Sequence, residues 1–181
     1  MHAEAKDQKA AGGLVVAGGV LATIAGFLDW ADFAPTDAAA TTFRGVDLSA
    51  GVGSLAFGVA LVIVAIFLFA RGGRTGGRGA SITAIVFALP ILIAAGYSAV
   101  APADALVEFQ SSRVAAEYGI SSEVTRTIEA GLELGNVDVS ALVGPWVATV
   151  GGLLGLVGGI AGLARSRRVR GRAHTAVRLE S

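Results

Sequence analysis

The chain has 181 residues, of which 54% are hydrophobic and 15% are charged, with a formal net charge of zero and no cysteine. This length suits one ordinary soluble domain, but the low charge content and four long uncharged runs are typical of membrane-spanning helices. The absence of cysteine excludes a disulfide framework, a thiol nucleophile and a cysteine-ligated metal site.

The first uncharged run predicts a membrane span at 10–28, preceded by a polar tail at 1–9. The two lysines before the run also suit a signal peptide. We reject this alternative because the run is long for a signal sequence and no small-residue cleavage site is evident before Trp30. The segment is therefore expected to remain in the protein as a helix.

Three further uncharged runs predict spans two, three and four, each with about 19–22 residues, enough to cross a hydrocarbon core of about 30 Å. A helix satisfies its own backbone hydrogen bonds, so the predicted fold is an all-α, integral membrane four-helix bundle. The expected order is an outer loop at 29–49, span two at 50–70, an Arg/Gly link at 71–79, span three at 80–101, an outer segment at 102–143, span four at 144–164 and an arginine-rich tail at 165–181.

The outer segment predicts a small helical insertion. Val124, Ile128 and Leu132 form an apolar stripe at a spacing of four residues, and Gly135 stands where such a helix ends. Seven acidic residues and two arginines fall within 102–140. The segment therefore suits an acidic hairpin that covers the outer end of the bundle, or a surface that binds a partner.

Charge asymmetry predicts the orientation. The N-terminal tail, the Arg/Gly link and the C-terminal tail contain eleven basic residues, whereas the two remaining loops contain three. Because basic residues next to spans are retained in the cytoplasm, both termini are expected inside a bacterial cell, and the spans form two in–out–in hairpins. Trp30, Tyr97 and Trp146 fall at the predicted outer ends, as aromatic residues of the membrane interface do.

Two echoes in the sequence indicate an internal duplication. Residues 46–53 and 137–144 match at six of eight positions, and each segment precedes an apolar run. Residues 34–38 and 101–105 also resemble each other, and each segment follows an apolar run. Chance similarity is the alternative, because Ala, Val and Gly are abundant throughout the chain.

The first echo contains residues that suit helix caps. Asp and Ser accept hydrogen bonds from the free N–H groups of a helix's first turn, and a negative charge there also suits the helix dipole. Asp47 and Ser49 are thus expected to cap span two, and Asp138 and Ser140 span four. A cation site shared by Asp47 and Asp138 is the alternative.

Glycines predict close packing between helices, because their spacing lets backbones approach. Internal packing of the bundle and association with a membrane-protein partner or a second copy both fit. The candidate residues are Gly12, Gly19 and Gly26 on span one, and Gly151, Gly155, Gly158, Gly159 and Gly162 on span four.

Pro90 lies in the middle of span three and predicts a kink, because proline removes one backbone hydrogen bond. This kink is either a fixed packing feature or a hinge.

The arginine-rich tail is a candidate contact for anionic lipid headgroups, each charge contributing about 1 kcal/mol near the surface. A simple stop-transfer anchor is the alternative, and nucleic-acid binding is not expected from so short a segment against the membrane. The residues concerned are Arg165, Arg167, Arg168, Arg170 and Arg172.

No catalytic constellation is present. The spans contain no ionisable residue inside them, and the sequence has no HExxH, P-loop, nucleophile elbow or metal-spaced His/Cys cluster. We therefore expect no enzyme, no cofactor and no metal, but a structural or interaction component, or an accessory subunit, of a membrane complex. The alternative is a small transporter or channel component for an uncharged or lipid-like solute, gated around Pro90.

Three short motifs carry a family resemblance: 26–30 (GFLDW), 45–47 (GVD) and 144–146 (GPW). In these motifs and in its layout the chain resembles uncharacterised four-span integral membrane proteins of actinobacteria. The resemblance implies a plasma-membrane location and no particular reaction.

Overall fold

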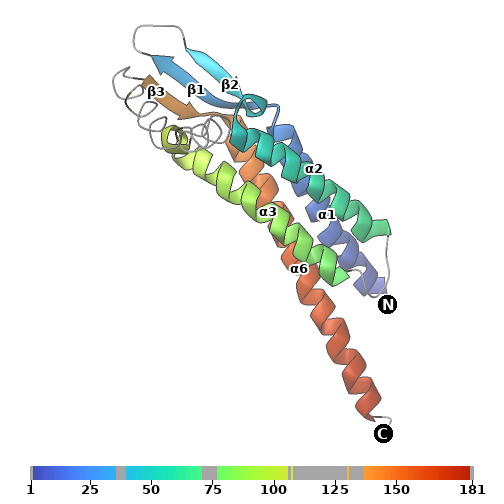
Figure 1. The fold of residues 1–181 in the computed structure, drawn as a ribbon. Coiled ribbons are helices and arrows are strands. Elements are labelled where there is room, and N and C mark those ends of the chain that lie inside the picture. The colour runs from blue at the N-terminus through green and yellow to red at the C-terminus, as the bar shows by residue number, and fades with distance from the viewer. Residues whose placement is uncertain are drawn as a thin grey trace, which may run out of the picture.

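The computed structural model describes residues 2–35, 40–70, 77–105, 107, 130 and 137–179. The protein is mostly helical, with a small antiparallel sheet at one end (Figure 1). The long helices are α1 (His2–Ala25), α2 (Ser49–Ala70), α3 (Gly77–Val100) and α6 (Val143–Leu179), and the strands are β1 (Asp29–Pro35), β2 (Thr41–Arg44) and β3 (Val137–Ala141), with a 3-10 turn η1 (Gly45–Asp47) before α2.

Three of the helices contain segments long and apolar enough to cross a membrane: Ser49–Phe67, Arg78–Val100 and Val143–Arg165. They correspond to the predicted second, third and fourth spans. In α1 the apolar part is shorter, Ala10–Ala25. The first span was predicted to reach residue 28, but the backbone leaves the helix after Ala25 and enters β1 at Asp29.

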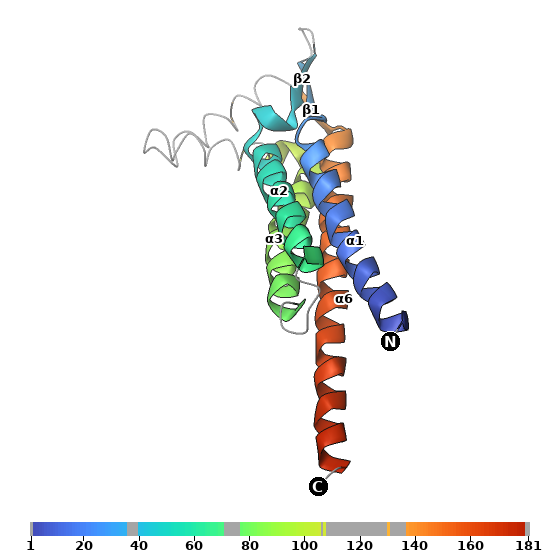
Figure 2. The ribbon, with the colours of Figure 1, turned by 90° about the vertical axis from the view of Figure 1, so that its right-hand side faces the viewer.

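The four helices pack side by side, with α6 between α1 and α3, and α2 against both α1 and α3 (Figures 1 and 2). Helices α2 and α6 are diagonal neighbours that meet at the centre of the bundle. There Leu61 of α2 is fully buried, and a Cβ added to Gly155 of α6 would lie 3.2 Å from its Cδ1 atom. The centre is thus filled by one large side chain opposite a glycine.

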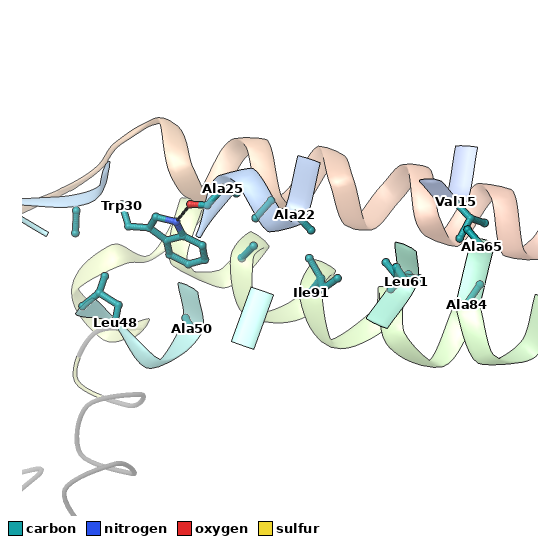
Figure 3. Close-up of a cluster of buried hydrophobic side chains, with 14 residues drawn as sticks. Val15, Ala22, Ala25, Trp30, Leu48, Ala50, Leu61, Ala65, Ala84 and Ile91 are labelled. Atoms are coloured by element: carbon teal, nitrogen blue, oxygen red, sulfur yellow. Dashed lines mark hydrogen bonds between the residues drawn. The ribbon is translucent and has the colours of Figure 1, made fainter. Parts of the chain in front are cut away.

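Most buried positions of the bundle carry small side chains, with Val15, Leu61 and Ile91 as larger exceptions, whereas large apolar side chains cover the outside. A soluble protein has its large apolar side chains mostly inside. The fully buried positions include Ala22, Ala25, Ala65 and Ala84, which Figure 3 labels, and also Ala88, Ala95 and Ala148. Exposed large residues come from every long helix: Ile24, Ile63, Ile66, Phe67, Val86, Ile93, Leu153, Val157 and Ile160.

The sheet has the strand order β2-β1-β3, and both pairings are antiparallel. Its central strand places Asp32 opposite Thr42 of β2 and Ser140 of β3. The predictions of a loop at 29–49 and of a helical segment reaching 143 are wrong where these strands lie. The strands are short, and β1 pairs with a segment about a hundred residues away, so local periodicity did not reveal them.

Two predicted features fall on residues whose structure is not described. The helical insertion lies mostly within 106, 108–129 and 131–136, and most of the Arg/Gly link lies within 71–76. Both stay predictions.

Candidate functional site

The junction between the sheet and the bundle is organised around Trp30. This side chain is 1% exposed, and its indole N–H donates a hydrogen bond to the Ala25 carbonyl oxygen, 2.6 Å away (Figure 3). Carbonyl groups in the last turn of a helix lack partners within that helix. The Ala25 carbonyl oxygen also accepts a hydrogen bond from the Leu28 backbone N–H at 3.2 Å, so the indole is its second donor. The bond gives the polar atom of the buried tryptophan a partner.

Two glycines from distant parts of the chain make room for this indole. A Cβ on Gly45 would lie 2.6 Å from both Trp30 Nε1 and the Gly26 carbonyl oxygen, and a Cβ on Gly144 would collide with Trp30 Cδ1. Backbone hydrogen bonds close the site, from Gly45 N–H to Leu28 O at 2.9 Å and from Leu142 N–H to Trp30 O at 3.0 Å. We call this cluster of Trp30, Gly26, Gly45 and Gly144 the Trp30 socket.

The socket shows that the Trp30 side chain does not face outward, as an aromatic side chain of the membrane interface would. Trp30 is buried, whereas Trp146 is 53% exposed and Tyr97 is 37% exposed. A position near the end of an apolar run does not distinguish an outward-facing from an inward-facing indole. The three motifs at 26–30, 45–47 and 144–146 could have indicated that Trp30 is buried, because they meet at this socket.

Glycines of α6 bring its backbone against α1. A Cβ on Gly151 would lie 2.7 Å from the Gly18 carbonyl oxygen and 2.8 Å from the Ala22 nitrogen. A Cβ on Gly158 would lie 2.8 Å from the Ala11 carbonyl oxygen. Any side chain at these positions would strike backbone, so the contact requires glycine.

A second set of α6 glycines faces α3. A Cβ on Gly159 would lie 2.8 Å from Ile85 Cγ1, and one on Gly152 would lie 3.0 Å from the Leu92 nitrogen. Gly162 faces the Ser81 side chain in the same way. The glycines predicted on span four thus divide between two neighbours, with Gly155 at the bundle centre.

The glycines predicted on span one face a different helix. A Cβ on Gly19 would lie 2.8 Å from the Gly58 carbonyl oxygen, and one on Gly26 would lie 2.9 Å from Leu55 Cβ, both on α2. Gly12 is also buried. The α1 surface that meets α6 instead centres on Gly18, because adjacent helix residues point about 100° apart.

The predicted caps do not form a matched pair. The carboxylate of Asp47 accepts a hydrogen bond from the Arg44 backbone N–H at 3.1 Å, which closes η1, and Ser49 is the first residue of α2. Asp138 and Ser140 lie in β3, so the prediction that they cap α6 is wrong. The echo segments therefore adopt different local structures.

The remaining predicted positions lie away from the socket. Pro90 is inside α3, which continues as helix on both sides. Arg165 ends an apolar segment of α6. Arg167, Arg168, Arg170 and Arg172 lie on the helical continuation of α6, where the structure describes the backbone alone.

No group of three or more His, Asp or Glu residues that could hold a metal ion occurs in the described part of the chain. No protein-family model, curated protein or solved structure matches the sequence. The surfaces of the helices and the packing between them are therefore the basis for a functional proposal.

Proposed function

We propose that the chain is a multi-pass plasma-membrane protein with four spans, acting as a structural or interaction component of a membrane complex. The observation that supports it best is the distribution of side chains, with many large apolar groups exposed outside and mostly small ones inside. Lipid tails are as apolar as these exposed side chains, so the outer surface costs nothing in a bilayer. In water the same surface would favour aggregation.

The contacts between antiparallel helices give a second support. Gly162 faces Ser81, so three further residues along each helix bring Arg165 level with Arg78. Gly152 faces Leu92. Six residues back along α6 and five residues onward along α3 therefore bring Trp146 about level with Tyr97. Each helix thus has a basic residue at one level and an exposed aromatic residue at the other, as the two membrane interfaces favour.

The separation of these two levels fits a bilayer. Nineteen residues separate Arg78 from Tyr97, and nineteen separate Trp146 from Arg165. At 1.5 Å per residue this is about 28 Å, close to the hydrocarbon thickness of about 30 Å. Two neighbouring helices therefore indicate the same position and thickness for the hydrocarbon core.

We include α1 as the fourth span although its apolar part is short. It packs between α2 and α6 along the bundle, and Val20, Ile24 and Phe27 present apolar side chains outward. With α1 spanning, the basic termini lie in the cytoplasm and the sheet lies outside the cell. An internal duplication stays part of this hypothesis at the level of two helical hairpins, α1–α2 and α3–α6.

An interaction role suits the packing better than conduction does. The described centre of the bundle is occupied by Leu61, Ala88 and Gly155 in close contact, which favours a closed structural unit over a solute path. The sheet, by contrast, exposes Asp138 and Ser140 of β3 at the outer end. A partner has a polar surface to contact there, and the helices have apolar surfaces within the membrane.

Native mass spectrometry after gentle detergent extraction from the original host tests this role. We expect the chain to leave the membrane with a defined companion protein at fixed stoichiometry. The same preparation after stringent detergent treatment is the control, because it should release the companion and leave the bundle intact. Recovery of a lone monomer under gentle extraction would contradict the interaction role and favour transport.

A further inference from the structure

Basic residues from three helices lie at one level of the bundle, at the end opposite the sheet. The contact of Gly162 with Ser81 places Arg78 of α3 level with Arg165 of α6. On the other side of α6, Gly158 faces Ala11, so counting outward along α1 brings Lys6 close to the same level. These three positions are far apart in sequence and are brought together by the glycine contacts.

The helical continuation of α6 adds further charge at this end. Arg167 and Arg168 follow Arg165 by two and three residues, which is about 3–5 Å along the axis. The helix runs on beyond the ends of the other three (Figures 1 and 2). We call the set Lys6, Arg78, Arg165, Arg167 and Arg168 the basic layer.

The position of the basic layer indicates its ligand. It lies where the apolar segments of α3 and α6 end, which is the depth of the phosphate groups if these segments cross a bilayer. Its charges are spread over three helices, so they match a plane of many phosphates better than one small anion. Arginine suits phosphate through paired N–H donors.

We propose that the basic layer binds the phosphate groups of anionic phospholipids in the leaflet at this end of the bundle. The proposal rests on the membrane-spanning function proposed above. It goes further than an orientation signal, because it assigns a preference for anionic over zwitterionic lipid in the folded protein. A soluble acidic protein would reach only the part of α6 that extends beyond the other helices. Lys6 and Arg78 lie instead near the level where the apolar segments end.

Lipid selection by the full chain tests the proposal. The purified protein is reconstituted into vesicles of phosphatidylcholine with or without phosphatidylglycerol, and the lipids retained on extraction are quantified by native mass spectrometry. We expect phosphatidylglycerol to be enriched. Arg78→Gln and Arg165→Gln should each lower this enrichment by about fivefold, the factor that corresponds to about 1 kcal/mol per charge.

Arg44→Gln is the matched control, because Arg44 is an exposed arginine at the sheet end, 3.9 Å from Asp29. It should leave the enrichment unchanged. Equal retention of both lipids by the unaltered chain would overturn the proposal, as would an equal loss in the Arg44 variant. A chain that stays soluble without detergent or lipid would instead overturn the membrane function, so the two failures are distinguishable.

Discussion

Trp30 is the residue on which the sheet end of the bundle depends. Its indole fills a space bounded by glycine backbone from η1 and from the start of α6, and it also bonds the end of α1. Gly45 and Gly144 cannot become alanine without displacing it. One buried side chain thus joins three segments that are up to about 115 residues apart.

We expect Trp30→Ala to destabilise the protein by about 3–5 kcal/mol, the usual cost of removing a large buried aromatic side chain. Trp146→Ala is the matched control, because Trp146 is 53% exposed, and it should cost less than about 1 kcal/mol. Thermal or denaturant unfolding in detergent measures both. Equal losses in the two variants would contradict the socket.

At the scale of elements, glycine decides how closely the helices approach. A Cβ on Gly151 or Gly158 would lie within 2.8 Å of α1 backbone, and a Cβ on Gly155 would meet the Ala88 and Leu61 side chains of α3 and α2. Dispersion between closely packed surfaces stabilises helix pairs where lipid supplies no hydrophobic drive. These contacts lie inside the bundle and are therefore occupied by its own helices.

We expect Gly151→Ala to destabilise the bundle by about 1–3 kcal/mol, because the added methyl group would overpack against the backbone of α1. Gly53→Ala is the matched control: it is also a helical glycine, but a Cβ there meets nothing within 4 Å. That change should stabilise the chain by about 0.5–1 kcal/mol through reduced backbone freedom. The unfolding midpoints of the two variants should therefore move in opposite directions.

At the scale of the whole molecule, charge and structure are polarised along the bundle axis. The sheet lies at one end, and both described helix termini, His2 of α1 and Leu179 of α6, lie at the other (Figure 1). Segments between the first and second helices and between the third and fourth meet in one sheet. Both of these segments must therefore lie on the same side of any membrane that the helices cross.

Because the chain has no cysteine, single-cysteine variants test this topology. With a membrane-impermeant maleimide on intact cells, we expect labelling of Thr42→Cys and Asp138→Cys. Gly79→Cys and Ala3→Cys should be labelled only after the membrane is opened. Labelling of Ala3→Cys from outside would show that α1 does not span, and labelling of Gly79→Cys from outside would reverse the whole orientation.

The sequence by itself determined the helices. Long uncharged runs can only be helical in lipid, so the positions of α2, α3 and the apolar part of α6 followed from hydropathy. The packing role of the glycines on span four could also be predicted, because their spacing is a local property of the sequence. The sheet could not be predicted, because strands of four to seven residues carry little periodic signal, and β1 and β3 pair across a long sequence separation.

Only the tertiary structure decided which neighbour each residue meets. Gly18 and Gly19 differ by one position and face different helices. Trp30 and Trp146 each lie at one end of an apolar run, but Trp30 is buried and Trp146 is exposed. The repeated Asp-x-Ser segments differ in structure: the first runs from the end of η1 to the first residue of α2, and the second lies in β3. Which helix a side chain faces, and which strands pair, depend on contacts between segments that are distant in sequence. A membrane helix, by contrast, is specified by the chemistry of one continuous segment.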